Sequence, residues 1–268
     1  MLTFPNAKIN LGLNITAKRA DGYHDIESCF YPIPMKDALE IISSKKLNFS
    51  STGIPIPGNT EDNLVIKAYH LIKADFDIPA VEIILHKNIP MGAGMGGGSA
   101  DGAFMLTLLN DYFKLNISKE KLEEYALKLG SDCPFFIENK PKLVSGRGEI
   151  FEDSKLDLSG YYLALVFPAI HISTAEAYNG IIPLKAETSV SVKETIENHP
   201  IEEWKMILKN DFEKGIFRKH PELQAIKNNF YDDGAVYASM TGSGSTIFGL
   251  FDKSIDLNKI QADELIEL

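Results

Sequence analysis

The chain has 268 residues, 44% of them hydrophobic, which suits one large domain or two modest ones with a sizeable core. Its formal net charge of -10 argues against nucleic acid or an anionic membrane as the main partner, because these partners demand a basic face. There is no long apolar run and no secretion pattern at the N-terminus, so we expect a cytoplasmic protein. Cys29 and Cys133 lie far apart without metal-ligand spacing, which predicts reduced, packed thiols.

The first expected strand, residues 7–15, alternates apolar and polar side chains, so Lys8, Asn10 and Asn14 share one face. A polar face on an early strand is usually just solvated. Two asparagines beside a lysine make a functional face more plausible than a single lysine would.

A turn is predicted at residues 19–25, where Asp-Gly leads into a second strand at residues 26–31. Tyr23 and His24 follow this turn directly. Their two neighbouring rings suit contact with a planar ligand, although a plain hairpin would also explain the segment.

Further strands are expected at residues 38–42 and 47–50, continuing an antiparallel pattern. A helix is expected after residues 59–62, and then a strand at residues 81–85. This last strand leads into the most unusual stretch of the sequence.

Residues 90–101 read PMGAGMGGGSAD, with five glycines within seven positions. Glycine loses more backbone entropy on folding than any other residue, so this density indicates that the main chain must approach a ligand closely. A helical pattern starts at Ser99, and helix N-termini carry free N–H donors and partial positive charge. The stretch therefore predicts a phosphate-binding loop rather than an ordinary surface turn.

Two common kinds of phosphate loop do not fit this stretch. The Walker form is excluded because the loop ends in Gly98-Ser99-Ala100 without lysine. The dinucleotide pattern G-x-G-x-x-G is matched by Gly92, Gly94 and Gly97, but a second helix at residues 119–129 follows where that fold needs a strand.

A tight acidic turn at residues 131–136 follows Gly130, a typical helix stop. It contains Asp132 and is held by Pro134. An aspartate in a turn is most often a cap or turn former, so the meaning of Asp132 depends on Lys8.

A soft boundary near residue 155 divides the chain into an expected N-terminal domain, 1–155, and a C-terminal domain, 156–268. The second part predicts strands and helices in the following order: strand 161–167, helices 174–178, 190–197, 201–217 and 222–230, and strands 235–240 and 246–251. The last two strands are joined by a second glycine loop, residues 241–245. A plain hairpin and a loop that binds a phosphate or sugar edge explain it equally well.

Four motifs, at residues 7–10, 90–101, 130–135 and 241–244, together resemble the superfamily of galactokinase, homoserine kinase, mevalonate kinase and phosphomevalonate kinase. Residues 19–24 resemble the hallmark of its 4-diphosphocytidyl-2-C-methyl-D-erythritol kinase family. The resemblance implies a two-domain α+β fold with an N-terminal nucleotide domain, a C-terminal antiparallel sheet with helices, and an active site in the cleft between them. It also implies ATP-dependent phosphorylation of the 2-hydroxyl of a cytidine diphosphate sugar alcohol, in the non-mevalonate route to isoprenoid precursors.

By resemblance, catalysis falls on Lys8 and Asp132. An aspartate can accept the proton of the acceptor hydroxyl, and a neighbouring lysine would keep it ionised. The resemblance assigns substrate binding to Asn10, Tyr23, His24, Thr174, Tyr178, Gly242 and Ser243, with the cytosine gripped by Tyr23 and His24 and stacked on Tyr178. It assigns the ATP site to Pro90, Met91, Gly92, Ala93, Gly94, Met95, Gly96, Gly97, Gly98, Ser99 and Ala100.

Magnesium is expected with ATP, and Ser99 is the motif hydroxyl best placed for it, but no second metal ligand stands out. Ala93, Met95 and Ala100 depart from the family pattern, and Ala100 removes one possible hydroxyl contact.

Other functions remain open at this point. A homoserine or mevalonate kinase would share both glycine loops but would have no use for Tyr23 and His24. A non-catalytic relative would lack Lys8 or Asp132, and both are present. A dinucleotide-dependent oxidoreductase is the least favoured alternative.

Overall fold

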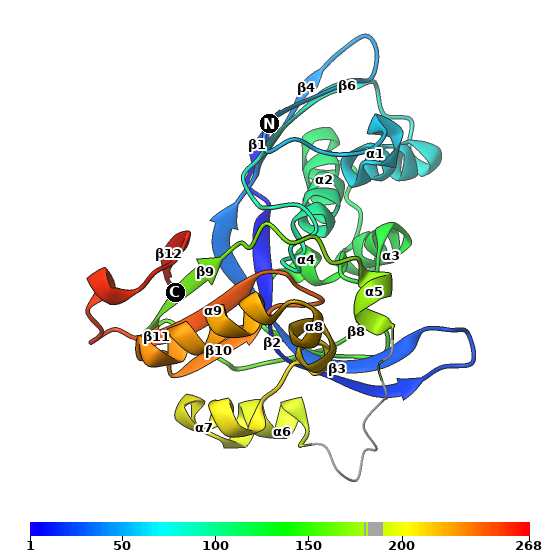
Figure 1. Cartoon of the computed structure of the whole chain (residues 1–268). Helices are drawn as coiled ribbons and strands as arrows, with labels where there is room; N and C mark the ends of the chain where they lie inside the picture. The colour runs from blue at the N-terminus through cyan, green and yellow to red at the C-terminus, as the bar shows by residue number, and fades with distance from the viewer. Residues whose placement is uncertain (180, 182–189) are drawn as a thin grey trace. The chain divides into compact units, whose positions relative to one another are not determined.

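The computed structural model describes residues 1–179, 181 and 190–268 (Figure 1). The chain forms two compact units, each assembled from separate stretches. The first unit contains Met1–Lys8, Pro34–Met91 and Gly96–Lys140, and the second contains Ile9–Ile33, Gly92–Met95 and Pro141–Leu268. The glycine loop therefore contributes residues to both units.

The first unit combines a sheet with a layer of helices. The sheet has the order β1-β4-β6-β5, with β1 (Leu2–Thr3), β4 (Ala38–Ser43), β6 (Val81–Lys87) and β5 (Asn48–Gly53). The helices are α1 (Leu64–Asp75), α2 (Gly97–Phe113), α3 (Lys119–Leu129) and the short α4 (Phe135–Glu138). Helices α1, α2 and α3 pack on one another (Figure 1). A Cβ at Gly102 of α2 would lie 2.9 Å from Cβ of Leu64, so the glycine permits the close approach of α1.

The expected antiparallel pattern is wrong for β5. Strand β4 pairs with β6 antiparallel, but β5 pairs with β6 in parallel, from Asn48 opposite Glu82 to Gly53 opposite Lys87. Helix α1 lies between β5 and β6 in the sequence and carries the chain back, so the two strands run in the same direction.

Two further sheets lie mainly in the second unit. One has the order β2-β3-β7-β8, with β2 (Asn6–Lys18), β3 (His24–Lys36), β7 (Lys142–Ser145) and β8 (Ile150–Asp153). The start of β2, residues 6–8, and the end of β3, residues 34–36, belong to the first unit. The other has the order β10-β11-β9-β12, with β10 (Tyr237–Met240), β11 (Ile247–Asp252), β9 (Tyr161–Val166) and β12 (Glu264–Glu267). This second sheet is antiparallel throughout, as the family resemblance implied.

The helices of the second unit are α5 (Thr174–Tyr178), α6 (Val192–Asn198), α7 (Ile201–Ile207), α8 (Asp211–Lys219) and α9 (Pro221–Asp232). The prediction of one helix over residues 201–217 is wrong, because the helical backbone is interrupted between the end of α7 and the start of α8. The N–H of Leu13 donates to the C=O of Lys209 at 2.8 Å, and the Asn210 side chain accepts from the N–H of Phe212, which caps α8. The contact with β2 therefore ends one helix and the cap begins the next.

Helices α7 and α9 both pack against the sheet that contains β10. Trp204 of α7 meets the ring of Tyr237 edge-on at 5.7 Å, and Phe230 of α9 meets that of Phe251 at 5.9 Å. All four aromatic rings are fully buried, so they anchor the two helices to the sheet.

Candidate active site

The two residues predicted to carry catalysis lie together in the first unit. Lys8 lies on β2, and Asp132 lies in the turn between α3 and α4. Nζ of Lys8 is 3.5 Å from Oδ2 of Asp132. The Lys8 side chain is 4% exposed and that of Asp132 is 37% exposed, so the aspartate is the partner that a ligand can reach.

The polar face of the first strand is buried rather than solvated, since Lys8, Asn10 and Asn14 are 3%, 2% and 6% exposed. Burial lowers the pKa of Lys8, and the charge and hydrogen bond of Asp132 oppose that shift. The ion pair is thus what favours the protonated lysine at a site that otherwise disfavours charge.

A reciprocal amide pair ties the two catalytic segments together. Nδ2 of Asn6 donates to Oδ1 of Asn139 at 3.2 Å, and Nδ2 of Asn139 donates to Oδ1 of Asn6 at 2.6 Å. Asn6 lies two residues before Lys8, and Asn139 follows α4, the helix that begins just after the Asp132 turn. The pair therefore fixes the strand of Lys8 against the segment of Asp132.

Asn6→Ala is expected to destabilise the protein by about 1–3 kcal/mol, because it leaves a partly buried amide without its partner. It is also expected to lower kcat, since the Lys8 strand loses its tie. Asn139→Gly removes the other amide, and glycine tolerates the left-handed backbone of this position (φ 54°). If the two amides act as a pair, the double variant Asn6→Ala, Asn139→Gly should lose little more stability than either single variant. Chemical denaturation and steady-state kinetics measure both effects, with Asn258→Ala as an exposed-amide control. Fully additive losses would show that the two amides do not act as a pair.

The glycine loop has the backbone of an anion-binding loop. Gly92, Gly94 and Gly96 have φ angles of +65°, +78° and +71°. Helix α2 starts at Gly97, two residues earlier than the sequence predicted, and no side chain caps its N-terminus. A Cβ at Gly98 would meet no atom within 4 Å, so the space beside the first turn is open. The N–H groups of this turn are therefore able to bind an anion.

The start of α2 contacts both catalytic segments. A Cβ at Gly96 would lie 3.1 Å from Cζ of Phe136 and 3.3 Å from Cε of Lys8. The Ser99 hydroxyl hydrogen-bonds to the Cys133 thiol, whose pKa burial raises to about 12. The helix start, Lys8 and the Asp132 turn thus form one continuous site within the first unit.

In the second unit, the second glycine loop supports the Gly92–Met95 segment. The Thr241 hydroxyl donates to the C=O of Gly94 at 3.1 Å and accepts from the N–H of Asn10 at 3.0 Å. Gly242 has a φ of +54°, and a Cβ there would lie 2.9 Å from the C=O of Gly94. The loop joins the hydrogen-bonded strands β10 and β11, so it is a hairpin that also contacts the first loop, with Ser243 half-buried at its tip.

The Asn10 side chain, predicted to contact substrate, is buried and donates to Oγ of Ser28 at 3.0 Å. Oδ1 of Asn10 lies 3.4 Å from the Thr241 hydroxyl and is the alternative acceptor for its proton. Asn10 thus links β2 and β3 with the second glycine loop.

The structure also brings His24 and Tyr178 together. Their rings stack with centroids 4.8 Å apart and an angle of 20° between the planes. Phe212 meets Tyr178 edge-on, also at 4.8 Å. A cavity of about 520 Å³ adjoins this stack and is lined by Lys18, His24, Ala175, Glu176, Tyr178, Asn179 and Ile181. Thr174, the first residue of α5, is exposed.

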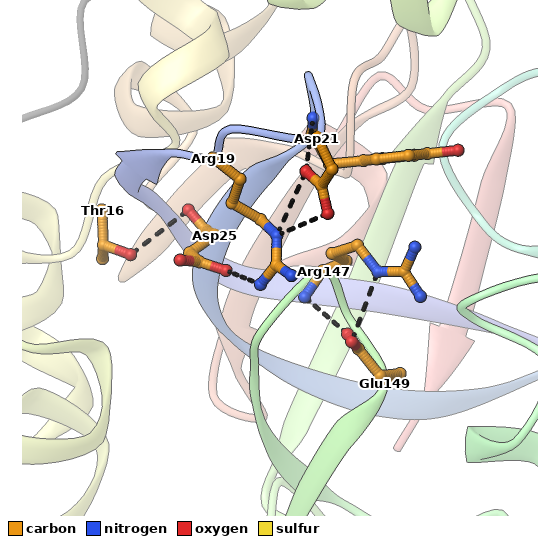
Figure 2. A network of polar contacts seen from close by, with 7 residues as sticks. Thr16, Arg19, Asp21, Asp25, Arg147 and Glu149 are labelled. Atoms are coloured by element: carbon orange, nitrogen blue, oxygen red, sulfur yellow. Dashed lines mark hydrogen bonds and ion pairs between the residues drawn. The ribbon is translucent and has the colours of Figure 1, made fainter.

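Tyr23 is 58% exposed, and the guanidinium of Arg147 lies over its ring at 5.0 Å. Arg147 is itself held by Glu149, and on the neighbouring hairpin Arg19 bonds Asp21 and Asp25 (Figure 2). The Asp21 carboxylate also accepts from the N–H of Tyr23 at 3.1 Å, and that bond lowers its pKa. Ion pairs and hydrogen bonds within residues 19–25 thus hold this turn in place.

Sequence reasoning missed Arg147 and the cavity residues Lys18 and Glu176. The signal for Arg147 was its place between two glycines in a turn that leads into a strand. Nothing in the sequence alone pairs that turn with Tyr23.

Across residues 1–179, 181 and 190–268, we find no group of three or more His, Cys, Asp or Glu arranged to hold a metal ion. In the same part of the chain, no helix is long and apolar enough to cross a membrane. Both cysteines are buried and free.

Comparison with known proteins identifies the class to which this fold and site belong. The family of GHMP kinases N-terminal domains matches residues 63–140, and that of GHMP kinases C-terminal domains matches residues 192–263. A mevalonate kinase from Methanococcus jannaschii shares the fold, with a TM-score of 0.68 at 13% identity over 100% of this chain and 98% of that one. The chain thus has the fold of a GHMP kinase.

Individual relatives narrow the class. A 4-diphosphocytidyl-2-C-methyl-D-erythritol kinase from Parabacteroides distasonis is 53% identical over 94% of this chain and 92% of its own length. The protein of that name from Bacteroides fragilis is 52% identical over 97% and 95%. A crystal structure of a 4-(cytidine 5'-diphospho)-2C-methyl-D-erythritol kinase matches with a TM-score of 0.75 and 28% identity, covering 93% of this chain and 90% of that one. This chain belongs to the 4-diphosphocytidyl-2-C-methyl-D-erythritol kinase family, and it is an ATP-dependent small-molecule kinase.

Proposed function

We propose that the protein transfers the γ-phosphoryl group of ATP to the 2-hydroxyl of 4-diphosphocytidyl-2-C-methyl-D-erythritol, a step of the non-mevalonate route to isoprenoid precursors. The observation that carries the proposal is the pair formed by Lys8 and Asp132, 3.5 Å apart beside the start of α2. The names of relatives that share about half of its residues support the choice of substrate.

In the proposed reaction, Asp132 accepts the proton of the 2-hydroxyl while that oxygen bonds to the γ-phosphorus. The bond between the γ-phosphorus and the bridging oxygen breaks, and ADP leaves. Phosphoryl transfer needs mainly positioning and charge stabilisation, which the buried Lys8 and the N–H groups of α2 would supply. General-base help of this kind is worth about 10²- to 10⁴-fold in rate.

Binding of the cytidine half is proposed to use the aromatic residues of the second unit, with Tyr23, His24 and Tyr178 holding the base. Asn10, Thr174, Gly242 and Ser243 would add polar contacts. The stack of His24 on Tyr178 supports the proposal, because it indicates that flat rings pack well at this place. ATP would lie along residues 90–100.

Magnesium would enter with the triphosphate and neutralise its charge, with the Ser99 hydroxyl as a protein ligand. We also propose that the enzyme works in the cytoplasm and that its sequence divides into domains 1–155 and 156–268. The two family matches support that division, since they end and begin on either side of residue 155.

The deciding experiment is a coupled ATP-consumption assay across candidate alcohols. Turnover is expected with the cytidine diphosphate substrate and not with homoserine or mevalonate. Turnover with either of those two alone would overturn the substrate assignment.

A further inference from the structure

A buried cluster of three charged residues lies beneath the glycine loop in the first unit. Lys87, the last residue of β6, bonds the carboxylates of Asp37 and Asp101, the latter with an Nζ to Oδ2 distance of 2.7 Å. Asp37 follows β3, and Asp101 lies on α2. The three side chains are at most 4% exposed.

The cluster holds the chain on both sides of the glycine loop. On the N-terminal side, Oδ1 of Asp37 accepts from the N–H of Asn88 at 2.6 Å and from that of Ile89 at 2.9 Å. On the C-terminal side, Lys87 holds Asp101, in the first turns of α2. A Cβ at Gly97 would lie 3.5 Å from Nζ of Lys87, so the cluster reaches the helix start itself.

A contribution to folding stability alone does not explain this cluster. It sets two carboxylates against one lysine, and buried ion pairs often contribute no more than apolar residues of similar volume would. Within the described residues, Oδ1 of Asp101 has no hydrogen-bond partner although it is fully enclosed. Burial raises the pKa of Asp101 to about 7, Lys87 opposes the shift and Asp37 adds to it. These features indicate that the cluster positions the backbone segments it contacts, residues 88–89 and the start of α2.

We propose that Asp37, Lys87 and Asp101 are positioning residues that clamp both flanks of the glycine loop in the geometry that binds the triphosphate. The inference rests on the proposed use of this loop for ATP. Without the clamp, a loop so rich in glycine would sample many backbone conformations, and binding ATP would have to order it.

The test compares Asp101→Ala with Asp101→Asn. Alanine removes the bridge between Lys87 and α2 but leaves the neutral pair of Lys87 with Asp37, so the variant should fold. Asparagine keeps an oxygen to accept from Lys87 and removes only the charge. We expect the alanine variant to raise both the KM for ATP and the dissociation constant of a non-hydrolysable ATP analogue about tenfold, the equivalent of about 1.4 kcal/mol. The asparagine variant should stay near the parent, and kcat and the KM for the alcohol should change little in both.

Equal analogue binding by the parent and Asp101→Ala would overturn the clamp. A loss in Asp101→Asn as large as that in Asp101→Ala would also overturn it, because charge rather than geometry would then decide. A parent that does not bind the ATP analogue at all would instead refute the proposed function. Asp75→Ala is the matched control, since Asp75 bonds the Tyr125 hydroxyl in the same unit away from the loop and should affect stability only.

Discussion

Asp132→Asn is expected to lower kcat by about 10²- to 10⁴-fold and to leave the KM for ATP almost unchanged. The amide cannot accept the proton of the acceptor hydroxyl, while the start of α2 that is proposed to bind the phosphates is untouched. The split between kcat and KM is the informative result, because a loss of interactions made only in the transition state appears in kcat. Steady-state kinetics at saturating ATP measure it directly.

The same change removes the charge that faces the buried Lys8, so its structural cost must be measured separately. Glu138→Gln is a suitable control, because Glu138 lies on the adjacent α4 and pairs with Lys119 at 3.1 Å. It should keep parental turnover. Near-full activity of Asp132→Asn would show that another group takes the proton.

Alanine at Gly98 and at Gly96 is expected to separate ATP binding from stability. At Gly98 a methyl group would enter open space beside the helix start, where it contacts no protein atom. Helical alanine is favoured over glycine by roughly 0.5–1 kcal/mol, so the Tm should hold or rise. The KM for ATP should nevertheless rise about 10- to 100-fold, because the methyl group displaces the phosphate from charge-assisted hydrogen bonds worth about 1.5–3 kcal/mol.

Gly96→Ala should instead destabilise the protein. Gly96 has a φ of +71°, where an L-residue costs about 1–2 kcal/mol, and its Cβ would crowd Phe136 and Lys8. Thermal unfolding and ATP titration on both variants give the comparison. A parental KM for ATP in Gly98→Ala would show that the phosphates bind elsewhere.

Much of the fold could be predicted because local patterns determine it. The helical sequence patterns predicted α1, α2 and α3, Gly130 predicted the end of α3, and the two family matches confirm the kinase fold. Strands β1, β7, β8 and β12 were missed, because two to four residues carry little alternation; the four-residue β10 was predicted as part of a longer apolar run. The parallel pairing of β5 and the break before α8 depend on contacts with distant parts of the chain.

Some residues of the candidate site could likewise be predicted from local motifs, and others could not. Lys8 and Asp132 were predicted from motifs, and their assigned roles stay predictions that kinetics must test. The charged cluster under the glycine loop was missed, although one signal was present. Val81, Ile83, Leu85 and Lys87 alternate along β6, which places the lysine on the buried face. Its two partners come from other segments, so no local pattern joins them.

The stack of His24 on Tyr178 has a consequence for ligand affinity. A nucleobase that took its proposed place on the face of Tyr178 that His24 covers would displace the imidazole, so the histidine ring would act as an internal competitor for that place. The apparent affinity then falls in proportion to the fraction of molecules with the ring displaced. A substrate whose pyrimidine replaced the histidine ring would restore the stacking on Tyr178. A linear alcohol such as homoserine has no ring and could not restore it. Under the proposed binding mode, discrimination against simple alcohols would in this sense be built into the unliganded protein.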